Sequence, residues 1–488
     1  MSTKTRTGFK LARPCSMGLI VLLLGGCAVG PNYTRPVVDV GTSYKETQGW
    51  MPATPRDAAL RGDWWKLYGD PELDRLMNEL LASNLTIAQA EAQYREAQAL
   101  VQSARANFFP TVGAGASMTR SGSGGGQSGS SGSFGSGNGS NGGGAGNQYM
   151  LSGTVSWEPD LWGKVRREVE SSRAEEQASA ADVANARLSM QSTLAQTYFK
   201  LRTLDAQKLL YDQTVAAYEQ SLRTTQNRYD AGVAAQADVA ASRTQLENAK
   251  VQRLALNWQR AQLEHALAVL VGKAPSAFTL STTQAIGTVP NIPLTLPSSL
   301  LERRPDVAAA ERRTAEANAK IGVAQAAWFP DLTLSAQGGY RSGQWAQWLT
   351  APFNFWSLGP ALAVTLLDGG ARQAQVAQAR AGYDAQVAAY RLTALTALRE
   401  VEDYMVQLHV LAQEQVAQDR ALASARESLR LTMNQYNGGL IDYLSVVQVQ
   451  TAALSAETSD LSMKADRLVA SVQLIAALGG GWSAQKIQ

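Results

Sequence analysis

The sequence predicts a mainly α-helical chain with a membrane β-barrel part, built from two tandem copies of a β-β-α-α unit. Two long stretches that lack proline and nearly lack glycine predict long helices. Four shorter segments alternate apolar and polar residues, the pattern of barrel strands. The helical stretches also repeat each other at a fixed spacing, which indicates a duplication.

Each proline-free stretch predicts a hairpin of two long helices. The first covers residues 164–271, and its single internal glycine, Gly232, predicts a tip near 230–233. The second covers residues 371–478, where the pair Gly438-Gly439 predicts a tip near 437–441. The first arm, about 65 residues long, would span roughly 100 Å at the helical rise per residue. A compact globular domain does not need helices of that length.

The two halves of the chain are copies of each other. Residues 221–232 match residues 428–439 at seven of twelve positions, and Phe109-Pro110 corresponds to Phe329-Pro330. The first copy is longer because it carries a Gly/Ser run at 121–146, which predicts a flexible surface loop. The predicted organisation is therefore a first repeat at 76–272, a linker at 273–298, a second repeat at 299–479 and a tail at 480–488.

Four segments have the length and alternation of membrane strands: 108–120, 148–160, 330–342 and 355–368. A half-buried soluble sheet would alternate in the same way. An aromatic cluster near one end of the second strand pair favours the membrane interpretation, as an interfacial girdle would; it consists of Trp345, Trp348, Phe353, Phe355 and Trp356.

Four strands are too few to close a barrel, and lipid does not tolerate an open sheet edge. Three chains with four strands each would supply twelve strands, and their four long helices each would supply twelve helices around the same axis. We therefore expect a homotrimer in contact with outer-membrane lipid.

The N-terminus predicts a lipoprotein. Residues 1–26 combine four basic residues with a short apolar stretch, which is typical of a signal peptide. Leu24-Gly25-Gly26-Cys27 resembles a lipobox, so Cys27 is expected to carry the lipid and to begin a lipidated segment at 27–75. Ala28, rather than Asp, follows the cysteine, which implies sorting to the outer membrane.

Charge and composition exclude several classes of function. The full chain has 44 basic and 41 acidic residues, and the signal peptide carries four of the basic ones, so the mature chain has a net charge of 40 minus 41, or −1. This argues against a nucleic-acid partner. His265 and His409 are the only histidines, and no metal-ligand cluster, nucleophile motif or phosphate-binding loop accompanies them. We expect no enzyme activity, no metal and no cofactor.

Several motifs resemble a known family. The run Leu300-Leu301-Glu302-Arg303-Arg304-Pro305-Asp306-Val307, together with Ala326-Ala327-Trp328-Phe329-Pro330, resembles the signature of the TolC-like outer-membrane efflux factors. The segment 27–33 and Trp64-Trp65 are similar to the N-terminus of its NodT-type lipoprotein branch, which packs on an equatorial region. The resemblance implies a trimeric outer-membrane barrel that continues into a twelve-helix periplasmic α-barrel. It also implies two kinds of partner, a periplasmic adaptor protein and an inner-membrane pump of the resistance-nodulation-division type.

The resemblance also points to a periplasmic gate at the hairpin tips. Asp238 matches an acidic gate position of the family, whereas Ser445 and Gln448 replace the usual acidic pair of the second tip, and Asp442 is the candidate substitute. Tyr229 and Tyr436 either brace the closed gate or simply pack between helices. The candidate contacts for the adaptor are Gly232, Val233, Gly439 and Leu440; both glycines also suit a turn.

Three functions follow from these features. The first is a passive duct that exports drugs or other small toxic compounds. The second is a duct for type I protein secretion. The third is a periplasmic coiled-coil scaffold held to the membrane by Cys27, with its strands forming a small soluble sheet.

Overall fold

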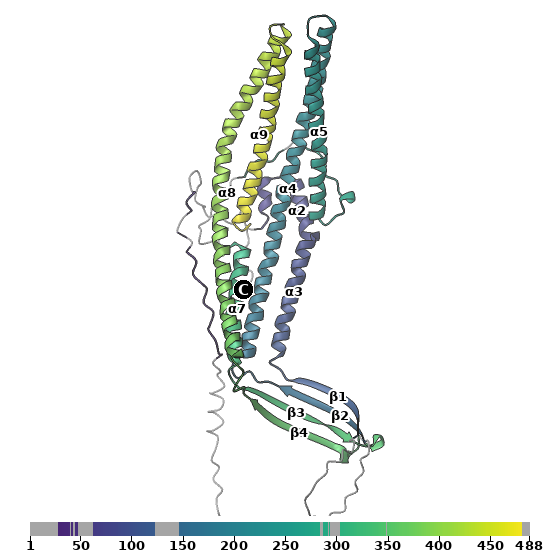
Figure 1. Cartoon of the computed structure of the whole chain (residues 1–488), viewed down its shortest axis with the longest axis vertical. Helices are drawn as coiled ribbons and strands as arrows, with labels where there is room; N and C mark the ends of the chain where they lie inside the picture. Colours follow the sequence, from purple (N-terminus) through teal and green to yellow (C-terminus); the bar gives the residue numbers. More distant parts are fainter. Residues whose placement is uncertain are drawn as a thin grey trace, which may run out of the picture. The chain divides into compact units, whose positions relative to one another are not determined.

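The computed structural model describes residues 28–39, 41, 44–46, 62–122, 146–283, 286–290, 292, 303–347 and 349–480 (Figure 1). The predicted signal peptide, the predicted lipidation site Cys27 and the aromatic Trp348 lie outside these residues. The chain divides into two compact units. One contains residues 1–34, 98–174 and 315–385, and the other contains residues 35–97, 175–314 and 386–488.

The helices repeat with the spacing that the sequence predicts. Helices α4 and α8 have 67 residues each, helices α5 and α9 have 35 each, and helices α3 and α7 have 22 each. Equivalent helices of the two hairpins begin 207 residues apart. Helix α4 starts at residue 164 and α8 at 371, while α5 starts at 236 and α9 at 443. The bounds are η2 Trp64–Tyr68, α2 Pro71–Ser83, α3 Leu85–Ala106, α4 Lys164–Asp230, α5 Gln236–Leu270, α7 Pro305–Ala326, α8 Ala371–Asn437 and α9 Tyr443–Ala477.

Proline and glycine explain where the helices begin and end. Pro71 and Pro305 stand at the first position of α2 and α7, where a missing backbone N–H costs nothing. The four hairpin helices end at glycines with positive φ, namely Gly232, Gly272, Gly439 and Gly479. Among the described residues, no helix has both the length and the apolar character that crossing a bilayer requires.

The strands form one antiparallel sheet in the order β1-β2-β3-β4, side by side in Figure 1. Their bounds are β1 Thr111–Ser121, β2 Gly146–Trp157, β3 Asp331–Ser342 and β4 Asn354–Ala363. The last strand ends five residues before the predicted residue 368. The reason is its register: Ala363 pairs with Asp331, which follows Pro330 and is the first residue of β3, so the residues after 363 have no partner strand.

This sheet is almost uncovered in a single chain. Every residue of β1 is exposed, although its side chains alternate between the two faces, and all ten residues of β4 are exposed or half-buried. Within the described residues, β1 and β4 each have one neighbouring strand and one free edge. A four-stranded sheet with open edges and uncovered faces is not a stable end state on its own, because unpaired backbone groups and apolar side chains remain outside.

The same unit holds the start of the described chain. Arg167 of α4, 4% exposed, donates to the backbone oxygens of Val29 and Gly30. The backbone N–H of Val29 donates to the carbonyl of Trp162 at 3.1 Å. Gly322 of α7 makes this close approach possible, since a Cβ there would lie 2.9 Å from the carbonyl oxygen of Val29. Residues 28–30 are therefore held directly against the helices of this unit.

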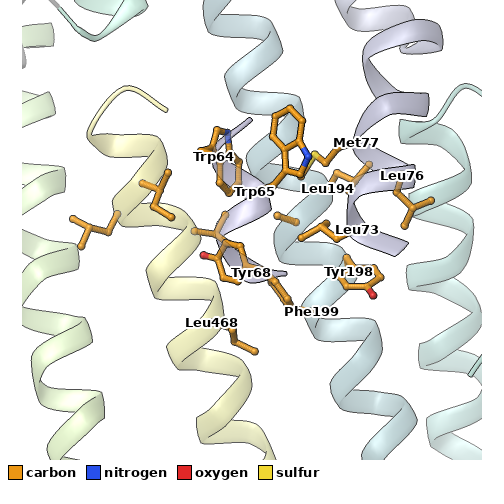
Figure 2. Close-up of a cluster of buried hydrophobic side chains, with 14 of the residues drawn as sticks. Trp64, Trp65, Tyr68, Leu73, Leu76, Met77, Leu194, Tyr198, Phe199 and Leu468 are labelled. Carbon is orange, nitrogen blue, oxygen red and sulfur yellow. The ribbon is translucent and has the colours of Figure 1, made fainter. Parts of the chain in front are cut away.

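The larger hydrophobic core lies in the other unit and is built around the short helix η2 (Figure 2). Trp64 and Trp65 are 0% and 2% exposed and pack edge to face, with ring centroids 6.0 Å apart. Tyr68 donates to or accepts from Ser471 at 2.7 Å. The residues that surround η2 come from α2, α4 and α9 and include Leu73, Leu76, Met77, Leu80, Leu194, Tyr198, Phe199 and Leu468.

Several buried or half-buried polar groups in this unit are paired. The carboxylate of Asp70 accepts from the backbone N–H groups of Glu72 and Leu73 and from the hydroxyl of Tyr198. The carboxylate of Asp205, 1% exposed, meets the guanidinium groups of Arg202 and Arg260. Both arginines also donate to carbonyls of the segment that follows α5, which ties that segment to the helices.

Two adjacent leucines test the importance of the η2 core. Leu80 is fully buried and Leu81 is 37% exposed on the same helix. We expect Leu80→Ala to lower the free energy of unfolding by about 2–5 kcal/mol, because it leaves a cavity in the core. Leu81→Ala, the matched control, should change it by less than about 1 kcal/mol. Thermal unfolding of the detergent-purified variants measures both effects; equal losses would contradict the assigned core.

Candidate functional site

The candidate site consists of the two hairpin tips, which belong to the same compact unit. Helix α4 ends in a tight turn in which Gly232 N–H donates to Tyr229 O and Val233 N–H donates to Arg228 O. Helix α8 ends in the same way, with Gly439 donating to Tyr436 and Leu440 donating to Gln435. These bonds define Schellman motifs, which require a left-handed residue. The two glycines supply it, with φ values of 76° and 74°.

The turns leave two apolar side chains exposed. Val233 is 66% exposed and Leu440 is 78% exposed, and each follows the turn glycine of its hairpin. The glycines themselves are open on the outside: a Cβ on Gly232 would meet nothing within 4 Å. Val233 and Leu440, two of the predicted adaptor contacts, are therefore accessible apolar side chains at equivalent positions of the two hairpins; we call them the tip knobs.

Asp238 lies in the first turn of α5 and stabilises the start of that helix. Its carboxylate accepts a hydrogen bond from the backbone N–H of Ala235 at 3.1 Å. This is one half of a capping box, because the alanine at the N-cap has no side-chain acceptor to complete it. The carboxylate also sits near the positive end of the helix dipole.

Asp442 plays the corresponding role at the start of α9, but from the N-cap position itself. Its carboxylate accepts from the backbone N–H of Ser445 at 3.1 Å and from the Ser445 hydroxyl at 2.7 Å. These two hydrogen bonds lower the pKa of Asp442 below its ordinary value. Ser445 therefore holds the carboxylate of Asp442 at the start of α9.

Tyr436 packs between the two hairpins. It is 5% exposed, its ring lies 5.5 Å from the ring of Tyr443, and its hydroxyl lies 3.3 Å from the hydroxyl of Thr225 on α4. The guanidinium of Arg228 stacks over the same ring at 4.5 Å and donates to the backbone oxygen of Tyr436 at 2.9 Å. One arginine thus holds the end of α8 against the end of α4 through a cation–π contact and a charge-assisted hydrogen bond.

Tyr443 completes this contact. It is 1% exposed, and its hydroxyl lies 3.0 Å from the hydroxyl of Ser221 and 3.1 Å from that of Ser242. Tyr443 therefore joins α9 to both helices of the first hairpin. Tyr229, the counterpart of Tyr436 in the first copy, is 40% exposed and takes no part in the cluster.

The structure brings some of the predicted residues together and separates others. Asp238, Asp442 and Tyr436 line one groove between the tips, with Gly232 and Val233 on its rim. Gly439, Leu440 and Tyr229 are not part of this groove. The sequence does not single out Arg228 and Tyr443, because the similarity between the two copies points to positions that are identical in both. These two residues stand where the copies differ, with Gln435 and Gln236 as their counterparts.

The described residues contain no group of three or more His, Cys, Asp or Glu side chains placed to hold a metal ion. The groove between the tips is lined by two aspartates, one arginine, two tyrosines and small or apolar residues of the two turns. Such a surface can set the width and the electric field of an opening, as rings of side chains do in other pores.

Comparisons with known proteins identify the family to which the fold belongs. A model of the outer membrane efflux protein family matches residues 76–273 and 296–480. The solvent efflux pump outer membrane protein SrpC of Pseudomonas putida is 29% identical over 468 residues, which cover 95% of this chain and 97% of that protein. Outer membrane protein OprJ of Pseudomonas aeruginosa is 30% identical over 474 residues, which cover 95% of each chain. The solved structure of the outer-membrane channel OprN, 28% identical, covers 93% of this chain and 100% of its own with a TM-score of 0.84.

The hydrogen bonds of Asp442 predict a pH effect at the second tip. The pKa of Asp442 is lower in the folded chain than its ordinary value of 3.8, so the ionised carboxylate stabilises the start of α9 at pH values above 3.8. This stabilisation is lost as the pH falls through the pKa of the folded chain. Below pH 3.8 we expect the protection of the amides of residues 443–446 against hydrogen exchange to fall, relative to their intrinsic exchange rates at the same pH. The variant Asp442→Asn keeps a capping side chain that does not titrate, so its protection should not fall in that range. Equal pH profiles for the two proteins would contradict the assigned role.

Proposed function

This chain belongs to the outer membrane efflux protein family and is an outer-membrane channel of an efflux system; we propose that it works as a passive, trimeric duct with its gate at the hairpin tips. The observation that supports the trimer best is the sheet. Its two free edges and its uncovered faces need strands from other chains, because an open edge in lipid leaves backbone groups without partners. Three copies of four strands give the twelve needed for a closed barrel.

The proposed cargo is small organic compounds. The name of the relative SrpC refers to a solvent efflux pump, which supports such compounds as the cargo. Type I protein secretion is the second candidate within the channel class. The periplasmic scaffold with a soluble sheet is disfavoured, because the sheet is exposed on both sides and the relatives are outer-membrane proteins of efflux pumps.

The proposed gate is the ring that the tips would form around a threefold axis. Asp238 and Asp442 would place six carboxylates in that ring, two from each of three chains, and the negative field would favour cations over anions. Tyr436 braces the closed state by holding the two hairpins of one chain together. Tyr229 remains available for a contact outside the chain.

The proposed partners are a periplasmic adaptor protein and an inner-membrane pump of the resistance-nodulation-division type. The adaptor would bind the tip knobs, Val233 and Leu440, beside Gly232 and Gly439. The energy for export would come from the pump, since the described residues offer only a path and a gate. Cys27 would carry the lipid anchor, as its lipobox predicts.

Planar-bilayer recording tests the proposed function. The purified full chain should insert as a trimer and carry a small, cation-preferring current in its closed state. Deleting the gene should raise the accumulation of a small lipophilic drug and leave the secretion of large proteins unchanged. A protein that carries no current, or a deletion that blocks only protein secretion, would contradict the proposal.

The charges of the gate give a specific prediction. The double variant Asp238→Asn/Asp442→Asn removes six carboxylates per trimer but keeps side chains that can cap both helices. We expect a higher leak conductance and a weaker cation preference, because the mutual field of the ring is lost. Glu247→Gln, on the exposed face of α5, is the control for a change of charge alone. If the double variant matched this control, neither aspartate would belong to the gate.

The adaptor surface gives another prediction. Val233→Asp/Leu440→Asp should abolish co-purification with the cross-linked adaptor, since a charge replaces an exposed apolar contact. Trimer mass should not change. Val37→Asp, at a residue that is 83% exposed in the N-terminal segment, is the matched control. Unchanged adaptor binding by the double variant would place the contact elsewhere.

A further inference from the structure

The two faces of the sheet differ in character. Residues that pair across neighbouring strands point to the same face. One row of pairs that crosses all four strands is apolar throughout: Val112, Val155, Ala336 and Leu358. The adjacent row is polar or glycine throughout: Gly113, Thr154, Gln337 and Ser357. In the proposed barrel the first face lies toward lipid and the second toward the lumen.

The luminal face carries one group of large side chains. Met150, Arg341 and Phe355 are the largest on this face, and they gather at the end of the strands that is remote from the helices. The guanidinium of Arg341 lies 4.7 Å from the centroid of the Phe355 ring, and one of its nitrogens lies 3.8 Å from the sulfur of Met150. Stacking on an aromatic face stabilises a cation at this position. Side chains from β2 and β4 therefore hold the arginine of β3.

A glycine makes room for this arrangement. Gly339 pairs with Phe355 and stands two residues before Arg341, on the same face. Because Gly339 has no side chain, the guanidinium can lean over the ring of Phe355. A Cβ at this position would also collide with the carbonyl oxygen of Leu151 on β2. A larger residue therefore cannot replace the glycine and cover the arginine without a shift of the strands.

The charge of Arg341 has no counterion within the sheet. The four strands hold three charged residues, Arg120, Asp331 and Arg341. Asp331 begins β3 and Arg341 stands ten residues later, so they are about 33 Å apart at the rise of a strand. Arg120 lies at the same end as Arg341, but the alternation of β1 places it on the apolar face with Met118. Of the described strand residues, Arg341 is therefore the only cation that faces the proposed lumen.

The first copy lacks this group. Strands β1 and β3 begin 220 residues apart, at 111 and 331, so Ser121 stands in the place of Arg341. At the spacing of 207 residues that relates α4 to α8, Gln148 stands in the place of Phe355. The stacked arginine thus occurs once in each chain and three times in the proposed trimer.

In that trimer the three arginines act on one lumen. Twelve strands, spaced about 4.8 Å apart and tilted by about 40°, close around a circumference of roughly 75 Å, which gives a radius of about 12 Å. This radius is comparable with the distance of about 8 Å over which physiological salt screens a charge. Because Arg341 is exposed and projects from the wall, the fields of the three guanidinium groups overlap in the lumen.

From these observations we propose that the outer end of the barrel contains a binding site for organic anions: Arg341 from three chains forms a cationic ring that binds the carboxylate of a small aromatic or apolar acid on its way out. The edge of a guanidinium matches a carboxylate with two parallel hydrogen bonds. Phe355 and Met150 supply apolar surface for the rest of the ligand. This proposal rests on the trimeric duct proposed above and extends it, since the acidic ring of the tips lies at the opposite end.

Block of the current by trimesate tests the proposal. Trimesate is a benzene ring with three carboxylates, so it suits a threefold ring of guanidinium groups. The full chain is inserted in planar bilayers, and trimesate is added to each side in turn. We expect half-block at a concentration about tenfold lower from one side than from the other, because the barrel end offers arginines and the tips offer carboxylates.

Arg341→Gln should raise the half-blocking concentration on the more sensitive side about tenfold, since the carboxylates lose their charged hydrogen-bond donors. The matched control is Arg120→Gln, which removes the same charge at the same end of the sheet but from the apolar face. This control should change the half-blocking concentration less than about twofold. Both variants should keep the trimer mass.

Two further variants separate the stacked guanidinium from charge alone, and they test the site even if Arg341→Gln does not assemble. Arg341→Lys keeps the charge but has no planar fork, and Phe355→Leu keeps an apolar side chain but removes the ring. Each should raise the half-blocking concentration about threefold.

The site would be overturned if the native channel and Arg341→Gln were blocked equally, or if Arg120→Gln lost as much block as Arg341→Gln. Unchanged block in both Arg341→Lys and Phe355→Leu would overturn it as well, because the stacked guanidinium would then have no part in binding. A native protein that carries no current before trimesate is added would instead overturn the proposed duct.

Discussion

The pairing of backbone hydrogen-bond groups in lipid is the constraint on which the architecture depends. A bilayer offers no water to an unpaired N–H or C=O group, so a sheet that enters it must have no edge. This chain contributes four strands, with β1 and β4 each open on one side in the part of the chain that the structure describes. A sheet of this size can meet the constraint only with strands from further copies, and the copy number is then set by the strand count that closes a barrel.

The duplication allows the helical hairpins, like the strands, to pair with those of a further copy of the chain. Because both hairpins have the same lengths and turns, each can present the same surface to a neighbour, whether the neighbour belongs to the same chain or to the next. A few substitutions then break the symmetry at the tips. Arg228 and Tyr443 have no equivalent in the other copy, and they place the strongest polar contacts inside the chain.

Much of the fold could be predicted from sequence because its signals are long and local. Proline-free stretches, the glycines at 232 and 439, and strand alternation act within a few residues, and the helix bounds agree with them. The end of β4 at Ala363 was harder to predict, since it depends on register with Asp331 on another strand. The partners of Tyr436 were also beyond sequence reasoning. Its contacts with Thr225 and Arg228 span more than 200 residues, and Tyr229, identical in type and equivalent in position, has a different environment.

The mass of the intact assembly tests the central claim most directly. Native mass spectrometry of the full chain, extracted from membranes in mild detergent, measures the number of copies independently of any channel activity. A single species with three times the mass of the lipidated chain is the result that closure of a twelve-stranded barrel predicts. A monomer or a dimer that persists across detergents would contradict it, because four or eight strands from this sheet would then have to satisfy their edges in some other way.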